Sequence, residues 1–142
     1  MFDRGSIYLA KLYPSKGAEP GKTRPVLILQ TNMLNHIGHT TTIIAPLTTK
    51  LIEDAYPLRY RIAGRAKLLQ DSDLLCDQIR AIDMQRLLPE KLAILTFQET
   101  TEIEQQIQAV LDFEQNTVNN DTDTQPHRLH QILPYKPNGA RL

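Results

Sequence analysis

The sequence predicts a small, mainly β fold of the α+β class: a strongly bent sheet or partly open barrel that ends in one long helix. Two observations lead to this prediction. Short apolar segments rich in β-branched and aromatic residues alternate with connections that contain Gly and Pro, which is typical of strands. Residues 96–113 combine the apolar spacing of a helix with a helix-start signal. At 142 residues, the chain has the length of about one domain.

Four strands are predicted in the first half of the chain, at residues 6–12, 25–31, 40–49 and 56–62. The second is a nearly continuous apolar run, which favours a strand covered on both faces, and its proline fits at the beginning of a strand. In the fourth, Arg59 and Arg61 alternate with apolar side chains, so we expect both arginines to face water or a ligand. Residues 31–39 are predicted to be a polar connection.

The second half contains a fifth predicted strand at residues 74–82, a short helical turn at residues 83–91 that stops near Pro89, and a further strand at residues 92–95. The long helix follows, because Thr96 and Glu99 have the spacing of a capping box. Its apolar positions share one face that we expect to lie against the sheet, namely Ile103, Ile107, Val110 and Leu111.

The composition changes after Phe113. Residues 1–113 form the predicted domain, whereas residues 114–142 are rich in Asn, Thr and Pro and show no sustained periodicity. We interpret residues 114–142 as a polar, flexible extension, with docking of its short apolar cluster as the alternative.

Composition limits the classes of function. The single cysteine, Cys76, cannot form an intrachain disulfide, and its apolar surroundings predict a core position. No apolar run approaches the ~18–20 residues of a membrane span and no signal-peptide pattern is present, so a cytoplasmic protein is predicted. Sixteen basic residues balance sixteen acidic ones, so a nucleic acid would need a local basic patch. Residues 1–30 contain such a patch, although ordinary solubilising charges are the alternative.

The loop at residues 16–26 places Glu19 and Arg24 among Gly and Pro residues, which prevent a helix there and favour turns. This loop belongs to an ordered series of motifs, Arg4-Gly5, Gly17-Ala18-Glu19-Pro20-Gly21 and Arg24-Pro25-Val26, continued by "APLTT" at residues 45–49 and "CDQIRAIDMQRL" at residues 76–87. The series resembles the MazF/PemK family of toxin–antitoxin ribonucleases over about residues 4–113. Ala18 departs from the serine that the family often has there.

The resemblance implies an SH3-like, partly open barrel of the MazF/PemK/CcdB type with a C-terminal helix, assembled as a homodimer that binds a cognate antitoxin protein. It also implies sequence-specific, metal-independent cleavage of single-stranded RNA such as mRNA, with no cofactor and no metal site. By position, the catalytic residues of the family fall on Arg24, Glu19 and Thr48. Thr49 is adjacent, so the site threonine is either Thr48 or Thr49.

These side chains suit a cleavage in which the ribose 2′-hydroxyl is the internal nucleophile. Glu19 is the candidate base, provided that its pKa rises above the ordinary ~4.3. Arg24 presents a planar fork of donors to phosphate oxygens, and charge stabilisation suits it better than acid catalysis because a guanidinium has a pKa above ~12. The Thr48 hydroxyl can donate to the same phosphate. The alternatives are a surface ion pair of Glu19 with Arg24 and a plain strand-end role for Thr48.

Other side chains are candidates to hold RNA, since single strands bind basic grooves and stack bases on aromatic rings. The candidates for RNA binding are Lys16, Lys22, Thr49, Arg59, Gln78 and Arg80. Gln78 and Arg80 are predicted either to contact bases or phosphate or to pair within the barrel. His36 and His39 lie three residues apart in a predicted loop, and we expect solvated side chains there, with metal ligands as the weaker alternative.

Two other functions stay open at this point. The nearest is a related toxin on the same barrel that binds DNA gyrase and cuts nothing, and the second is an inactive family member or a plain interaction domain. The joint presence of Glu19, Arg24 and Thr48 favours the ribonuclease, because a protein that only binds gyrase has no need of that set.

Overall fold

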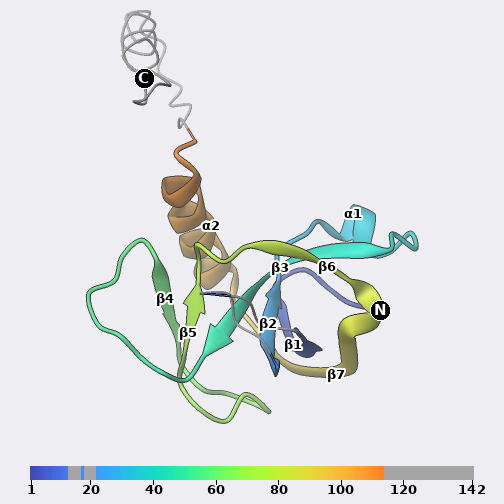
Figure 1. Cartoon of the computed structure of the whole chain (residues 1–142), viewed down its shortest axis with the longest axis horizontal. Helices are drawn as coiled ribbons and strands as arrows, with labels where there is room; N and C mark the ends of the chain where they lie inside the picture. Colours follow the sequence, from blue (N-terminus) through green and yellow to red (C-terminus); the bar gives the residue numbers. More distant parts are fainter. Residues whose placement is uncertain (13–16, 18–21, 114–142) are drawn as a thin grey trace, which may run out of the picture.

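The computed structural model describes residues 1–12, 17 and 22–113, which form an antiparallel sheet with two helices (Figure 1). In chain order the elements are β1 (Ser6–Lys11), β2 (Thr23–Ile28), α1 (Asn32–Asn35), β3 (Thr41–Thr48), β4 (Arg59–Ile62), β5 (Ser72–Leu75), β6 (Arg80–Asp83), a 3₁₀ turn (Met84–Arg86), β7 (Leu87–Ile94) and α2 (Phe97–Leu111). The predicted mainly β fold with a C-terminal helix is confirmed. The predicted extension at residues 114–142 lies outside the described residues.

The strands follow the order β4-β5-β3-β2-β1-β7, and neighbouring strands pair in antiparallel fashion. β3 has β2 on one side, while its other side pairs first with β6 and then with β5. The sheet curls round on itself, because the Lys67 N–H of the β4–β5 connection donates to the Leu92 carbonyl of β7 (2.9 Å). The strand path itself does not close, so the barrel is partly open.

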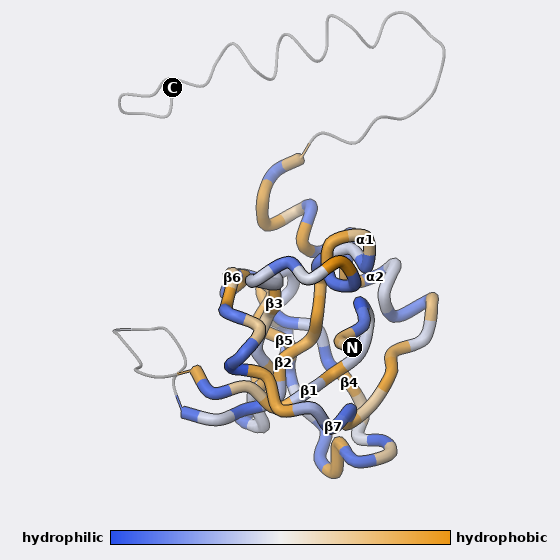
Figure 2. Tube along the Cα trace, turned by 90° about the vertical axis from the view of Figure 1, so that its right-hand side faces the viewer, coloured by the Kyte–Doolittle hydropathy of each residue, from blue (hydrophilic) through white to orange (hydrophobic). Residues whose placement is uncertain are grey.

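Both faces of the central strands are buried. Leu27 of β2 and Ala45 of β3 belong to one apolar cluster, whereas their neighbours Val26 and Ile44 belong to a second cluster on the opposite face. This burial explains the apolar run at residues 26–29, which makes up the second half of β2 and the residue after it, whereas Thr23 and Arg24 at the start of β2 are hydrophilic (Figure 2). The strand that was predicted to be covered on both faces is therefore confirmed.

The helix α2 covers the first of these clusters and stands above β4 and β5 (Figure 1). Its capping box forms as predicted: the Glu99 N–H donates to Thr96 Oγ1 (3.1 Å), and the Thr96 N–H donates to Glu99 Oε1 (2.8 Å). Ile103 is fully buried. The inward position predicted for Leu111 is wrong, because this last residue of the helix is 49% exposed. Within the described residues, no helix is long and apolar enough to cross a bilayer.

The single strand predicted at residues 74–82 is two strands. A turn separates β5 from β6, and within it the Gln78 N–H donates to the Leu75 carbonyl (3.0 Å). The turn lets the chain pair with both halves of β3, a long-range arrangement that the local apolar pattern does not reveal. The strand predicted at residues 56–62 is likewise shorter, because β4 begins at Arg59.

The helical turn predicted at residues 83–91 is confined to the 3₁₀ residues Met84–Arg86, and β7 already begins at Leu87. Pro89 therefore lies inside a strand. It is tolerated there because β7 is an end strand of the sheet path and the β1–β7 register skips between Lys91↔Tyr8 and Leu87↔Ala10. Pro89 thus sits at an irregularity where no regular ladder bond is required.

The predicted polar connection at residues 31–39 contains the short helix α1, whose first turn is capped by Thr31 Oγ1 accepting from the Met33 N–H (3.2 Å). Asn35, the last residue of α1, holds this helix to the neighbouring chain. Its Nδ2 donates to the Gln30 carbonyl (2.8 Å), and its Oδ1 accepts from Gln30 Nε2 (3.1 Å) and from Thr42 Oγ1 (2.9 Å). All three side chains are buried. These hydrogen bonds join α1 to Gln30 and to Thr42 of β3 through buried side chains that carry no charge.

Cys76 is fully buried, as its apolar surroundings predicted. Gln106 of α2 approaches its sulfur (3.7 Å) and also donates to the Pro57 and Arg59 carbonyls (3.2 and 3.0 Å). Burial, with a smaller effect from the neighbouring Asp77 charge, raises the pKa of the Cys76 thiol to about 12. The thiol therefore stays protonated beneath α2.

Candidate active site

The adjacent ends of β2 and β3 bring Arg24 and Thr48 side by side. The two strands pair in register from Ile28↔Ile44 to Val26↔Pro46, and the same register continued by two residues places Arg24 opposite Thr48. Arg24 Nη1 donates to the Leu47 carbonyl (3.3 Å), which holds the guanidinium against the end of β3. Both residues are half-buried. A guanidinium and a hydroxyl thus lie together at one end of the sheet.

Arg80 lies on the same face of the sheet as this pair. Arg80 of β6 is opposite Ile44, and Ile44 and Thr48 are four residues apart on β3, so the alternation of side chains along a strand directs all three to one face. The Nη1 of Arg80 is buried and has no hydrogen-bond partner, which holds for no other side-chain nitrogen or oxygen in the described part of the chain. Since buried donors are nearly always paired, this nitrogen of Arg80 is an exception among the described residues.

The Thr48 hydroxyl is oriented by the backbone that follows it. Its Oγ1 accepts a hydrogen bond from the Lys50 N–H (3.1 Å). A hydroxyl has one hydrogen and two lone pairs, so this bond occupies a lone pair and leaves the hydrogen to be donated. Thr49 is exposed and lies one residue beyond the strand.

Asp73 of β5 lies opposite Thr48 and joins two arginines of β4. Its Oδ1 accepts from Arg61 Nε (2.6 Å), and its Oδ2 accepts from Arg59 Nη1 (3.1 Å) and from the Ile52 N–H (2.9 Å). Burial alone would raise the pKa of Asp73, but these hydrogen bonds from Arg61, Ile52 and Arg59 hold it below its usual value. The arginines expected to face water or a ligand thus both bind a buried carboxylate.

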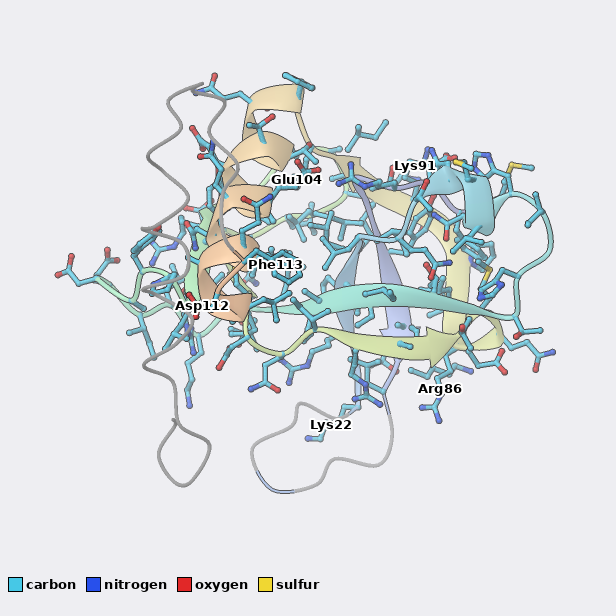
Figure 3. The ribbon with its side chains drawn as sticks, turned by 90° about the horizontal axis from the view of Figure 1, so that it is seen from above. Lys22, Arg86, Lys91, Glu104, Asp112 and Phe113 are labelled. Atoms are coloured by element: carbon cyan, nitrogen blue, oxygen red, sulfur yellow. The ribbon has the colours of Figure 1, made fainter. Side chains whose placement is uncertain are left out.

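Basic side chains flank the strand ends. Arg86 Nη1 donates to the Lys11 carbonyl (3.1 Å), and both residues line a shallow depression together with Asp83 and Gln85. Lys11 is paired with Thr23, the neighbour of Arg24, so this depression lies beside the candidate site. Figure 3 shows Lys22 and Arg86 projecting from the same side of the molecule. Lys11, Lys22 and Arg86 thus give this side more basic than acidic side chains, with Asp83 as the acidic neighbour in the depression.

The predicted site residues differ in what the structure places. Lys16 and Glu19 lie outside the described residues. Lys22 is exposed, and Gln78 is half-buried in the turn between β5 and β6. The structure therefore brings together Arg24, Thr48 and, on the same face, Arg80, and gives Arg59 protein partners.

His36 and Arg4 each pair with a carboxylate of the protein. His36 Nε2 lies 2.9 Å from Asp3 Oδ1, and Lys91 Nζ donates to Asp3 Oδ2 (3.0 Å). The hydrogen bonds from Lys91 and then His36 lower the pKa of Asp3. Arg4 pairs with Glu104 of α2, so its charge does not add to the basic side. Across the ranges 1–12 and 22–113, no three His, Cys, Asp or Glu side chains gather in a metal-binding group.

Sequence reasoning missed Asp73 and Arg86. Arg86 carried a signal, because it lies in the recognisable segment at residues 76–87. Asp73 carried none, since its importance comes from partners on β4 and in the β3–β4 connection, which lie far from it along the chain.

This fold is shared with small barrel-shaped toxins of known structure. The chain is similar to the Mycobacterium tuberculosis toxin MazF-mt6 (TM-score 0.64, 23% identity, covering 78% of this chain and 99% of that chain). It is similar to MazF from Deinococcus radiodurans (TM-score 0.64, 23% identity, covering 79% and 97%). It is also similar to an endoribonuclease from a mycobacterial species in complex with its cognate antitoxin (TM-score 0.64, 18% identity, covering 81% and 99%).

A family model described as the PemK-like, MazF-like toxin of type II toxin–antitoxin systems matches residues 3–111. The chain belongs to this family.

Proposed function

We propose that this protein is the toxin of a type II toxin–antitoxin system and cleaves single-stranded RNA at short specific sequences, acting in the cytoplasm. The observation that carries the proposal is the Arg24 guanidinium beside the Thr48 hydroxyl at the end of β2 and β3. Together they offer several donors to one phosphate. Family membership and the solved endoribonuclease of similar fold support the same activity.

The chemistry uses the RNA itself as nucleophile. The ribose 2′-oxygen attacks the adjacent phosphorus, the new O2′–P bond forms, and the P–O5′ bond breaks, which leaves a 2′,3′-cyclic phosphate and a 5′-hydroxyl. Glu19 accepts the 2′-hydroxyl proton, and the 5′-oxygen takes up a proton from water as it leaves. Arg24 and Thr48 donate to the phosphate oxygens as their negative charge grows, which is the step where fixed donors lower the barrier most. No step requires a metal.

RNA on both sides of the cleaved bond would contact the basic side described above. The proposed contacts are Lys16, Lys22, Thr49, Gln78 and Arg80. Arg80 is favoured by its position on the face of Arg24 and Thr48. The same positive side would attract an antitoxin whose binding segment is acidic.

The decisive experiment is cleavage of a long single-stranded RNA in excess EDTA, with the product ends mapped. We expect cuts at a short recurrent sequence that persist in EDTA, and a loss of about 100-fold or more in kcat for Arg24→Ala. Lys67→Ala is the matched control, because Lys67 is an exposed cation paired only with Glu90 among the described residues. No cleavage by the folded wild-type protein would contradict the proposal and favour the gyrase-binding alternative.

We also propose that the protein is a homodimer that meets its copy through α1. Met33 of α1 and Ile37 just after it are 78% and 71% exposed, while Asn35 holds this helix to Thr42 of β3. Residues 25–49 contain no Asp, Glu, Lys or Arg. In a two-fold contact the same patch covers itself, so these exposed apolar side chains would be buried against a second copy without burying a charge from residues 25–49. Ile37→Glu should turn the dimer into a monomer in sedimentation, and an unchanged mass would contradict this interface.

A further inference from the structure

We propose that Arg59 and Asp73 are positioning residues that hold the backbone after Thr48, so that the Thr48 hydroxyl points its hydrogen at the bound phosphate. This inference rests on the proposed function. It gives Arg59 a role through Thr48 in place of direct contact with RNA.

A continuous series of hydrogen bonds joins these residues. Thr48 Oγ1 accepts from the Lys50 N–H (3.1 Å), and the Lys50 carbonyl accepts from Arg59 Nη1 (2.8 Å). One peptide segment therefore connects the hydroxyl to the guanidinium. A displacement of Arg59 would release Lys50 and, with it, the partner that fixes the Thr48 lone pair.

Asp73 fixes the other side of the series. The Nη1 of Arg59 also donates to Asp73 Oδ2 (3.1 Å), and the same oxygen accepts from the Ile52 N–H (2.9 Å). Asp73 is only 1% exposed and belongs to the strand that pairs with Thr48. The buried carboxylate of Asp73 thus holds residue 52 directly and residue 50 through Arg59.

The chemical consequence is preorganisation. A threonine hydroxyl without this bond samples other hydrogen directions, and ordering it costs free energy when the transition state forms. With one lone pair held by Lys50, the hydrogen is directed away from Lys50 and is available for the phosphate beside Arg24. The expected signature is therefore a fall in kcat with little change in KM.

Arg61 provides a matched control on the same carboxylate. It donates to the other oxygen, Asp73 Oδ1 (2.6 Å), and its further partners are Glu53 and the Ile52 carbonyl, not Lys50. Its removal takes an ion pair from Asp73, as removal of Arg59 does, but leaves the bond from Arg59 to Lys50 in place.

The test is a double-mutant cycle on RNA cleavage. We expect Arg59→Ala to lower kcat about ten-fold in the wild-type background but less than about two-fold in a Thr48→Val background, because both changes remove the same donor. Arg61→Ala should keep kcat within about two-fold while showing a similar change in urea unfolding. A ten-fold loss in the Thr48→Val background, or a raised KM with unchanged kcat, overturns the proposal in favour of direct RNA contact by Arg59.

A second measurement separates this inference from the proposed function. The amide signal of Lys50 in NMR spectra should shift in Arg59→Ala and Thr48→Val but keep its position in Arg61→Ala. If the wild-type protein shows this pattern but cleaves no RNA, the proposed function is wrong. If it cleaves RNA while Arg59→Ala leaves the Lys50 amide unchanged, the positioning role is wrong.

Discussion

The two ends of β3 are held in opposite ways. At its beginning, Thr42 is fully buried and donates to Asn35, which belongs to a network of amides and hydroxyls without formal charge. At its end, Thr48 is half-buried and lies beside Asp73, which is bound by two arginines. The first end supports α1, and the second supports residues 50–52.

The two ends show where this fold uses neutral polar groups and where it uses charged ones. A neutral network can be buried completely, because its groups satisfy one another and no charge loses its water. Charged groups are costly to bury, so they lie where part of the cluster stays hydrated, and the arginines on Asp73 are indeed 20% and 37% exposed. The neutral end is suited to holding a helix in place, and the charged end is suited to a position beside an anionic substrate.

The largest effect is expected at the neutral end. Asn35→Ala leaves the Gln30 carbonyl, Gln30 Nε2 and Thr42 Oγ1 with fewer partners inside the protein. We expect the free energy of unfolding to fall by about 3 kcal/mol. Urea denaturation measures this change, with the exposed His39→Ala as the control at under ~0.5 kcal/mol. A loss below ~1 kcal/mol would mean that the network does not support α1.

The charged end should respond to pH, and the neutral end should not. Asp73→Asn is expected to cost about 2 kcal/mol at pH 7, less than a fully buried pair because its arginine partners are partly hydrated. The pKa of Asp73 is lowered in the fold, so its stabilisation is complete above the ordinary value of 3.8 and disappears as pH falls through the lower folded value. The difference between wild type and Asp73→Asn in urea unfolding should therefore shrink below about pH 4. The cost of Asn35→Ala should stay constant, and a parallel decline would contradict the comparison.

The smallest effect on stability comes from one substitution made at both ends. Thr42→Val removes a buried hydroxyl that donates to Asn35 and should cost about 1 kcal/mol in thermal unfolding, with RNA cleavage unchanged. Thr48→Val should cost only a few tenths of a kcal/mol but lower kcat, because its hydroxyl is half-buried and serves the substrate. Equal losses of stability, or equal losses of cleavage, would show that the two ends of β3 do not differ in role.

The sequence predicted the parts that depend on local pattern. The apolar run of β2 and the capping box of Thr96 and Glu99 both appear as predicted. The turn that separates β5 from β6 was missed, because the change of partner along β3 is a long-range event with no local apolar signal. A helical turn was predicted to stop near Pro89, but Pro89 lies inside β7. A strand accepts it there because of the place of β7 in the sheet, which the local sequence does not reveal.

The candidate site shows the same division. Arg24 and Thr48 were singled out through the motif series, and the register of β2 and β3 brings them together. Arg59 was expected to face water or a ligand from its alternation alone, and its partner Asp73 could not be found that way. Pairing between residues that are distant in sequence decides which charges remain for a ligand.

The burial of Cys76 gives the molecule an internal reporter of local opening. A thiol with a pKa near 12 that is covered by α2 cannot react with a disulfide reagent while the helix is in place. Its labelling rate at neutral pH therefore reports how often α2 moves away from Cys76, in a chain whose sequence contains no second cysteine. A binding partner that holds α2 in place would therefore slow the labelling of Cys76.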